Sequence, residues 1–383
     1  MKAIIITYND SYDFDTRTKY VTNYFLNKGI EVGFVISDFN HRTKKRYESG
    51  RENTIYISVP KYKKNISLGR LFSCYVFSKR VRKYIKEHPA DYIYHCAPPN
   101  CTIRELSKIK KDGKWFLITE IGDMWPESFP VSRKMKKMMQ IPFSLWKNLR
   151  NRYLYNSDFV ITECNLFKKY LQEHVKKQNI ETLYFCKEWK GNNRKLNIED
   201  EISVCYLGSI NNIIDINIFK QLVQELAKHK KVIIHIIGDG EKRGKLLKSL
   251  SYVEHVEVKF HGIIFDEEKK ENIFNNCHFA LNIMKEDVFV GMTMKSLDYF
   301  AYGIPMINNI RGDIWSLIDK ETVGFNISLN TIPRIAKQIS SLDNVSYEVM
   351  QKNVKNIHGE YFSIDAFNSF MDKVMDGFDE MKR

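Results

Sequence analysis

The sequence predicts an α/β protein made of two doubly wound domains. Short apolar runs typical of buried strands alternate with amphipathic stretches of helical period, an order that favours parallel strands joined by right-handed crossovers. The chain has 383 residues, which is more than one hydrophobic core usually supports. The alternation stops at a polar stretch, 187–200, and then begins again. We therefore expect one domain over 1–190, a second over 200–355 and a helical end over 356–383.

The first half begins with a continuous apolar run, Ala3–Thr7, that predicts a buried strand. An amphipathic helix with Tyr20, Tyr24 and Phe25 among its apolar residues follows, and Gly29 ends it. Further elements of this half are expected as strands at 31–37, 91–95, 114–119 and 158–162 and as a helix at 100–111. In the second half we expect strands at 202–207, 232–237, 256–260, 278–283 and 305–308, and helices at 214–229, 241–250 and 345–382.

The formal net charge of +14 narrows the expected partners to nucleic acid, an anionic membrane or a phosphorylated substrate. No nucleic-acid-binding motif is present, which argues against the first. No run reaches the roughly 18 to 20 apolar residues that span a bilayer, and the apolar N-terminus is too short for a signal peptide. The seven cysteines lack CxxC spacing, so neither a zinc site nor a disulfide framework is indicated. A reducing, cytoplasmic setting is expected.

A basic segment, 133–152, contains lysines and arginines but no acidic residue. Met138, Phe143 and Trp146 are interleaved with them, which is typical of a helix that lies in a membrane interface. Near an anionic leaflet each Lys or Arg contributes about 1 kcal/mol. We expect this segment to hold the protein at the inner face of the membrane. The alternative is a solvated basic face whose apolar residues belong to the core.

The most informative motif is Gly291–Ile307, in which a loop leads into a short helical run and then into the turn 303–305. Lys295 and Asp298 are three residues apart in the run and therefore share one helical face. Parallel sheets build ligand sites at the carboxyl ends of their strands, where helix N-termini favour anions. One cation and one anion there can hold a phosphate and a sugar hydroxyl, which predicts a nucleotide-sugar site.

Three glycine turns follow expected strands of the second half, at Gly208, at Gly238 with Gly240, and at Gly262. Glycine permits positive φ and a close approach of backbone amides to a ligand. Each turn alone also suits an ordinary strand-to-helix connection, but all three precede the motif that carries Lys295. No G-x-G-x-x-G or Walker A sequence is present, which argues against a dinucleotide oxidoreductase and a P-loop ATPase.

The order of these motifs resembles the family-4 glycosyltransferases of the GT-B fold. The resemblance rests on 207–209 (LGS), 236–240 (IIGDG), 260–263 (FHGI) and 295–305, and in the first half on 122–128 (GDMWPES). The last is similar to the D-x-W-P-E-S element of members that build bacterial surface polysaccharides. The resemblance implies two domains that face across a cleft, with the acceptor in the N-terminal domain and the sugar nucleotide in the C-terminal one. It also implies that the final helix packs back on the N-terminal domain.

The resemblance implies roles for single residues. Asp298 matches the acid that accepts hydrogen bonds from the ribose hydroxyls, and Lys295 matches a lysine near the diphosphate, where an ammonium stabilises the leaving group. The turn at Gly208 would lie beside the phosphates of the donor, and the turn at Gly262 would lie against its base. The expected donor site comprises Gly208, Ser209, Gly238, Gly240, Arg243, Gly262, Ile263, Met294, Lys295 and Asp298. For Arg243 an ordinary surface position is the stronger alternative.

The expected acceptor side contains Asp123 and Glu127. Either carboxylate could hydrogen-bond or deprotonate an attacking sugar hydroxyl. The alternative is that both cap a helix after Trp125, where acids in the first turn are favourable. Arg17, at the start of the first helix, is expected either to touch a phosphate or to form a local ion pair.

Two positions depart from the family pattern. Val290 stands where many members have a first acid, although Glu286 and Asp287 in the same loop could replace it. Gly122 stands where many members have a histidine. A non-catalytic subunit that binds sugar nucleotides therefore stays open as an alternative, as does an epimerase of the same fold.

Together, the residues and the resemblance predict a hexosyltransferase. The expected donor is a nucleoside-diphosphate sugar, with UDP as the nucleotide, and the expected acceptor is a lipid-linked or growing surface polysaccharide. Family resemblance implies retention of the anomeric configuration. We expect Lys295, Asp123 and Glu127 to carry the chemistry, with no metal ion and no cofactor besides the donor itself.

Overall fold

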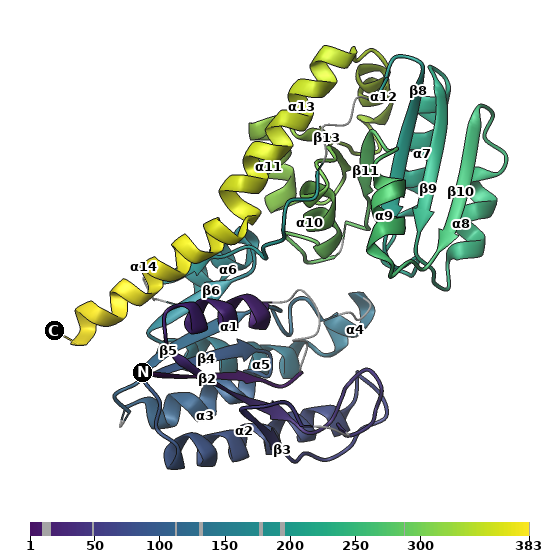
Figure 1. Cartoon of the computed structure of the whole chain (residues 1–383). Helices are drawn as coiled ribbons and strands as arrows, with labels where there is room; N and C mark the ends of the chain where they lie inside the picture. The colour runs from purple at the N-terminus through teal and green to yellow at the C-terminus, as the bar shows by residue number, and fades with distance from the viewer. Residues whose placement is uncertain are drawn as a thin grey trace. The chain divides into compact units, whose positions relative to one another are not determined.

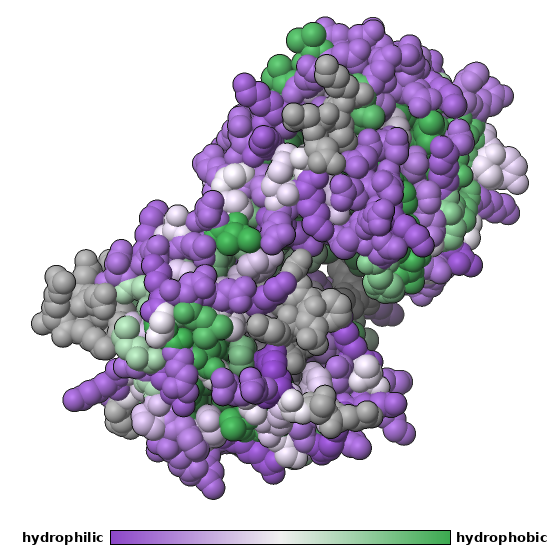
Figure 2. All heavy atoms as spheres, viewed as in Figure 1, coloured by the Kyte–Doolittle hydropathy of each residue, from purple (hydrophilic) through white to green (hydrophobic). Residues whose placement is uncertain are grey.

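The computed structural model describes residues 1–9, 17–47, 50–111, 113–129, 133–175, 179–191, 196–286 and 288–382. The chain divides into two compact units. The first unit comprises Met1–Phe185 with Phe367–Arg383, and the second comprises Cys186–Ala366. Each unit is built around its own sheet (Figure 1). On the face that Figure 2 shows, most of the surface is hydrophilic and hydrophobic residues gather only in small patches.

The sheet of the first unit contains seven parallel strands in the order β3-β2-β1-β4-β5-β6-β7. Their bounds are β1 Lys2–Thr7, β2 Glu31–Ser37, β3 Thr54–Ile57, β4 Tyr92–Ala97, β5 Phe116–Ile121, β6 Phe159–Thr162 and β7 Ile180–Thr182. The strand order reverses between β1 and β4. Ligands of open α/β sheets bind at the carboxyl ends of strands at such a reversal.

The helices of the first unit cover both faces of this sheet. They are α1 Arg17–Asn27, α2 Leu68–Glu87, α3 Asn100–Lys110, α4 Arg133–Met138, α5 Gln140–Leu154 and α6 Asn165–His174. Ile4 and Ile93 share a buried cluster with apolar residues of α2 and α3. Because successive strand residues point to opposite faces, Tyr92 lies on the other face, where its ring centroid is 5.7 Å from that of Phe25 in α1.

The C-terminal helix, α14 Ile364–Lys382, contributes its later residues to the first unit. Phe367 contacts Tyr20 of α1, with ring centroids 6.0 Å apart. Asp372 accepts a hydrogen bond from the hydroxyl of Tyr24 at 2.6 Å and forms an ion pair with Lys28 at 2.7 Å. The apolar spacing that predicts a helical tail is therefore used to pack α14 against α1.

The sheet of the second unit contains six parallel strands in the order β10-β9-β8-β11-β12-β13. The strands are β8 Glu201–Leu207, β9 Lys231–Ile237, β10 Val256–Gly262, β11 Phe279–Asn282, β12 Met306–Asn308 and β13 Gly324–Asn326. The helices are α7 Ile216–Ala227, α8 Arg243–Leu250, α9 Glu267–Phe274, α10 Met294–Ala301, α11 Asp313–Glu321, α12 Ile332–Ser340 and α13 Asn344–Ile357, followed by a π-helical turn, His358–Phe362. The strand order reverses between β8 and β11.

The start of α7 shows how the sequence sets an element of the second unit. Asp215 is the N-cap and accepts hydrogen bonds from the N–H groups of Asn217 and Ile218, both at 3.0 Å. From there the apolar residues recur at helical spacing, so Leu222 and Leu226 lie in the same buried cluster as the residues of β8 and β9.

The predicted fold class is confirmed, since both units are doubly wound parallel α/β domains. Each strand expected from the sequence is present, with bounds that differ by at most two residues. The edge strand β3 and the long helix α2 were not among the expected elements.

The polar stretch 187–200 was expected to be a linker, and its first residues are instead bound to the second unit. The N–H of Lys187 donates to the carbonyl oxygen of Phe362 at 2.9 Å, and that of Lys190 donates to Ala301 at 2.8 Å. Residues 192–195 lie outside the described part of the chain. The tail is helical as expected, but the π-helical turn interrupts it.

Candidate active site

In the second unit, α10 lies across the point where the strand order reverses. The hydroxyl of Tyr299 accepts a hydrogen bond from the N–H of Leu207, at the end of β8, at 2.7 Å. The same hydroxyl donates to the carbonyl oxygen of Leu281, in β11, at 3.3 Å. One buried side chain thus fixes α10 to both strands that flank the reversal, which is where open α/β sheets bind ligands.

The predicted glycine turns lie next to one another at this edge of the sheet. The N–H of Gly208 donates to Ile237 at 2.9 Å, and the N–H of Gly238 donates to Gly262 at 2.7 Å. Gly238 has a φ of +140°, and a Cβ on it would lie 2.0 Å from the carbonyl oxygen of Gly208. Only glycine permits this packing of backbone against backbone. A ligand at this edge would therefore contact the backbone atoms of the turns.

Lys295 is buried, with 8% of its surface exposed, beside the turn at Gly208. A Cβ on Gly208 would lie 4.0 Å from the Cδ of Lys295. The ammonium lies 4.6 Å from the centre of the Tyr206 ring. Among the residues that the structure describes, none forms a hydrogen bond or an ion pair with this ammonium. Burial lowers the pKa of Lys295 to about 7, so an anion placed beside it would favour its charged form.

Asp298 is paired with Lys187, and not with Lys295, which its spacing in the sequence suggests. Its Oδ1 is 2.6 Å from the Nζ of Lys187, and the two side chains are 16% and 22% exposed respectively. Within the described ranges, Oδ2 of Asp298 has no hydrogen-bond partner. The backbone oxygen of Lys187 is 3.0 Å from Nε2 of His358, which helps to fix the lysine. Lys295 and Asp298 therefore lie on one helix but contact different neighbours.

A row of asparagines, of which Asn282 and Asn308 are buried, supports the N-terminus of α10. Nδ2 of Asn282 donates to Asn308 at 2.9 Å, and Nδ2 of Asn308 donates to Asn326 at 2.9 Å, across β11, β12 and β13. Oδ1 of Asn282 accepts from the hydroxyl of Thr293 at 3.2 Å. Thr293 is the N-cap of α10 and accepts from the N–H of Ser296 at 3.3 Å. The asparagines thus fix a helix start whose dipole favours anions. These asparagines were not among the site residues predicted from the sequence.

Three of the predicted donor-site residues are exposed on this side of the second unit. Ser209 is exposed, and its carbonyl oxygen accepts a hydrogen bond from the hydroxyl of Tyr206 at 3.1 Å. Ile263 is 61% and Met294 47% exposed. Exposed apolar side chains near a binding edge are available to cover a ligand.

Arg243 lies on the surface and already has a partner. Its Nη1 is 3.1 Å from Oδ2 of Asp239. Oδ1 of the same Asp239 accepts from the N–H of Gly240 at 2.7 Å. This arrangement corresponds to the surface alternative, in which Arg243 stabilises the turn at Gly240.

In the first unit, Asp123 follows β5 and is held in place by its own loop. Oδ2 accepts from Nε1 of Trp125 at 2.9 Å, and Oδ1 accepts from the hydroxyl of Ser128 at 2.5 Å. Burial raises the pKa of Asp123, although these hydrogen bonds and the charge of Arg70 act in the opposite direction. Residues 125–128 form turns and no helix, so neither Asp123 nor Glu127 caps a helix after Trp125.

Glu127 forms a bidentate ion pair with Arg150 of α5. The two distances are 2.8 and 3.0 Å, and the Arg150 side chain is fully buried. Arg150 also donates to the carbonyl oxygen of Trp125 at 2.9 Å. Glu127 therefore compensates a buried charge and ties the loop to α5.

Arg17 forms an ion pair with an acid 103 positions away in the sequence, and not the local pair expected for it; its acidic neighbours Asp13 and Asp15 lie outside the described residues. Its Nε is 2.9 Å from Oε1 of Glu120, and its Nη1 donates to the carbonyl oxygen of Tyr184 at 2.8 Å. Of the two acids that could replace the one missing at Val290, Glu286 is exposed, and Asp287 lies outside the described residues.

The basic segment, 133–152, divides into exposed and packed apolar residues. Met138, Ile141 and Leu145 are 70%, 75% and 66% exposed. By contrast, Trp146 packs against Trp125, with ring centroids 5.6 Å apart. Trp146 is thus half-buried against the loop, while the other three are exposed and do not belong to the core. Along the described ranges, every helix is too short or too polar to traverse a bilayer. In those ranges, no three His, Cys, Asp or Glu side chains are placed to bind a metal ion.

The site in the second unit lies within a region that matches a known family. Residues 201–344 match the model described as "Glycosyl transferases group 1". This region is similar to glycosyltransferase group 1 domains. The matched region contains the turns at Gly208 and Gly238 as well as Lys295 and Asp298. No curated protein sequence matches the chain.

Several solved structures are similar to the chain over nearly its full length. One is sucrose-phosphate synthase from Thermosynechococcus elongatus, with 14% identity, a TM-score of 0.71 and 98% of each chain covered. A second is HepE from Anabaena in complex with UDP and glucose, with 14% identity, a TM-score of 0.64 and 98% of this chain and 99% of that chain covered. A third is the lipopolysaccharide outer core galactosyltransferase WaaB, with 16% identity, a TM-score of 0.65 and the same coverage. These likenesses establish the GT-B fold. On this fold, the match of residues 201–344 to the glycosyltransferase model supports a transferase enzyme.

Proposed function

We propose that the protein transfers a hexosyl group from a UDP sugar to a lipid-linked or growing surface-polysaccharide acceptor, with retention. The bond between the anomeric carbon and the diphosphate oxygen breaks, and UDP leaves with the electron pair. An acceptor hydroxyl forms the new bond on the same face and gives up its proton. In this proposal the second unit binds the donor and the first binds the acceptor.

The observation that carries the proposal is the buried ammonium of Lys295. It lies beside the turn at Gly208, near the start of α10, and no described acid compensates its charge. A leaving diphosphate develops negative charge, which a fixed ammonium and the amides of a helix N-terminus stabilise more strongly than they stabilise the intact donor. HepE, which has the same fold, has been solved with UDP-glucose, and this supports a UDP sugar as the donor.

Asp298 is proposed to bind the ribose of the donor. Its Oδ1 is held by Lys187 at 2.6 Å, which leaves Oδ2 to accept hydrogen bonds from vicinal hydroxyls. The turn at Gly262 with the exposed Ile263 would then lie against the base.

On the acceptor side, Asp123 is the proposed base. Its pKa is raised by burial, which moves a carboxylate toward the range useful for taking a proton. Glu127 is proposed to act in a different way, by orienting the loop through its ion pair with Arg150.

The exposed apolar residues of the basic segment support attachment to an anionic membrane surface. Met138, Ile141 and Leu145 are interspersed with lysines, a combination that binds interfaces through both apolar burial and charge.

A nucleotide-release assay with a panel of sugar donors tests the proposal. UDP release that depends on an acceptor supports transfer, and Lys295→Ala should lower the turnover number by ~10²-fold or more. Isomerisation of the donor sugar without release would indicate the epimerase instead. Tight donor binding without turnover would indicate a binding subunit.

A further inference from the structure

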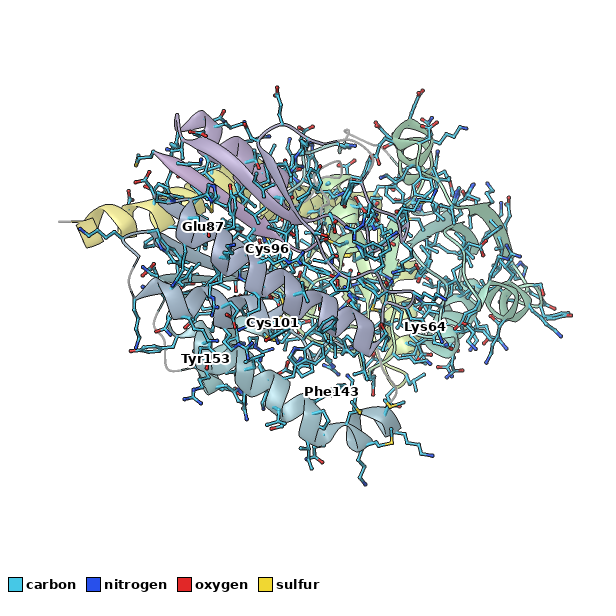
Figure 3. The ribbon with its side chains drawn as sticks, turned by 90° about the horizontal axis from the view of Figure 1, so that it is seen from below. Lys64, Glu87, Cys96, Cys101, Phe143 and Tyr153 are labelled. Atoms are coloured by element: carbon cyan, nitrogen blue, oxygen red, sulfur yellow. The ribbon has the colours of Figure 1, made fainter. Side chains whose placement is uncertain are left out.

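The first unit contains an apolar cavity that is separate from the donor site. It has a volume of about 640 Å³ and lies among α2, α3, α5 and the loop after β5. This volume is within the range of small-molecule sites, roughly 300 to 1,000 Å³. Its walls include Leu71, Tyr75, Phe143, Trp146 and Leu149. Figure 3 shows α2 and α5 on this side of the unit, with Cys101 of α3 between them and Phe143 on α5.

The charge at the cavity has one sign. The charged residues that line it are Arg70 and Arg104, and no acid is among its lining residues. Arg104 is paired with Glu105 at 3.0 Å, so Arg70 is the cation available to a ligand. The guanidinium carbon of Arg70 lies 4.9 Å from the Trp125 ring centre. Nη1 of Arg70 donates to Asn65 at 3.1 Å, whereas its buried Nε has no partner in the described part of the chain. An apolar interior with an unpaired donor of Arg70 at its wall fits an amphiphile with an anionic head.

The surface around the cavity is apolar as well. On α2, Leu68, Leu71, Phe72 and Tyr75 follow one another at helical spacing and are 83%, 40%, 58% and 43% exposed. Across the cavity, Ile141 of α5 is 75% exposed. A soluble surface rarely leaves such a stripe uncovered, so a hydrocarbon phase is the expected neighbour.

The cavity also adjoins the proposed acceptor site. Trp125 forms part of its wall, and Nε1 of the same ring donates to Asp123 at 2.9 Å. Pro99 and Asn100, which follow the carboxyl end of β4, form another part of the wall. A head group at the cavity therefore lies at the edge of the sheet where α/β domains bind ligands.

We propose that this cavity holds the first part of the hydrocarbon chain of a lipid phosphate acceptor, with the phosphate at Arg70. The inference rests on the proposed function, because it assigns the lipid of the acceptor to a site in the first unit. The chain is held by apolar burial and the phosphate by charge-assisted hydrogen bonds. This arrangement brings the sugar attached to the phosphate toward Asp123.

Titration of the full-length protein with alkyl phosphates tests the inference. The probes are decyl phosphate, butyl phosphate and decanol, all below micelle formation, and the readout is calorimetry together with tryptophan emission. Each buried methylene tightens binding about fourfold, so decyl phosphate should bind at least a hundredfold more tightly than butyl phosphate. Equal affinities of the two phosphates would overturn the inference.

Two neighbouring residues of α2 provide a matched pair of variants. Leu71 lines the cavity and Phe72 does not, although both are exposed. Leu71→Asp should weaken decyl phosphate binding at least tenfold, while Phe72→Asp stays within twofold of the wild type. Equal loss in both variants would show adsorption to the outer apolar surface and overturn the inference. Leu71→Trp, which fills the entrance without adding charge, should also weaken binding.

A second pair of variants tests the phosphate position. Arg70→Met should weaken decyl phosphate binding about tenfold and leave decanol binding unchanged. Arg80→Met, on an exposed position of the same helix, should change neither. A decyl phosphate affinity unaffected by Arg70→Met would refute the assignment of the head group. Titration of UDP into the same samples tests the donor site separately, because that site is in the second unit.

Discussion

Oδ1 of Asp298 is paired with the ammonium of Lys187 at a distance of 2.6 Å. The pair joins α10 to the first residues of the second unit, whose backbone is bound to the π-helical turn that follows α13. It orients the carboxylate so that Oδ2 is the atom left for a ligand. A residue in an apparent linker therefore sets the geometry of the proposed ribose site.

Removing the charge of Asp298 should weaken nucleotide binding. We expect Asp298→Asn to raise the Kd for UDP about tenfold, because hydrogen bonds to a charged acceptor are stronger than those to an amide. Lys187→Met should raise it by a smaller factor, since the acid is retained but loses its orientation. Calorimetric titration measures both. Glu348→Gln, on α13, is the control, and an Asp298→Asn protein that binds UDP as the wild type does would exclude a ribose contact.

Replacing Asp123 should lower turnover without changing donor binding. Asp123→Asn keeps the size of the side chain but removes the base, so acceptor-dependent turnover should fall by ~10²-fold or more. UDP binding should not change, because Asp123 is in the first unit. Glu173→Gln, on the exposed face of α6, controls for a general effect of charge. Turnover retained in Asp123→Asn would remove Asp123 from the mechanism.

Breaking the asparagine row should destabilise the second unit. Asn308 is fully buried, donates to Asn326 and Ile310, and accepts from Asn282. Asn308→Leu leaves buried amide groups without partners, which costs about 2 to 4 kcal/mol. Calorimetry should show a lower unfolding temperature for the transition of the second unit. The exposed Asn217→Ala should leave the transitions of both units unchanged. An unaltered thermogram for Asn308→Leu would contradict this role.

The sequence was sufficient for the central strands of each sheet, but not for the edge strands β3, β7 and β13 or for the partners of the site residues. Continuous apolar runs predict buried parallel strands, and these strands are present. The spacing of Lys295 and Asp298 correctly places them on one helix, but packing decides where each side chain goes. Lys295 extends under a glycine turn to Tyr206, while Asp298 meets a lysine more than a hundred positions earlier in the chain.

Other features were missed for physical reasons that particular residues show. The exposed apolar stripe of α2, beginning at Leu68, does not resemble a buried helix face, and basic residues interrupt its pattern. The asparagines at 282, 308 and 326 are uninformative one at a time, because their hydrogen bonds form only when β11, β12 and β13 are neighbours. Such long-range pairing is a property of the sheet order and not of local sequence.

Neutralising part of the basic segment should reduce membrane binding. Replacement of Lys134, Lys136 and Lys137 by Gln should lower partitioning onto anionic vesicles by ~10²-fold at low salt, since each lysine contributes about 1 kcal/mol. Sedimentation with vesicles measures the change. The same replacement at Lys337, Lys352 and Lys355 of the second unit is the control. Partitioning that is equal in the two triple variants would argue against attachment through this segment.

The pH dependence of UDP binding tests the central claim most directly. Burial lowers the pKa of Lys295 to about 7 in the free protein, and a bound diphosphate favours the charged amine. Below pH 7 the amine is already protonated, so binding needs no proton uptake. As the pH rises above 7, binding must take up a proton, and the Kd should increase by up to about tenfold per pH unit. In Lys295→Met the Kd should be at least tenfold higher at neutral pH and nearly constant up to about pH 9. Parallel pH profiles for the wild type and Lys295→Met would contradict a diphosphate site at Lys295.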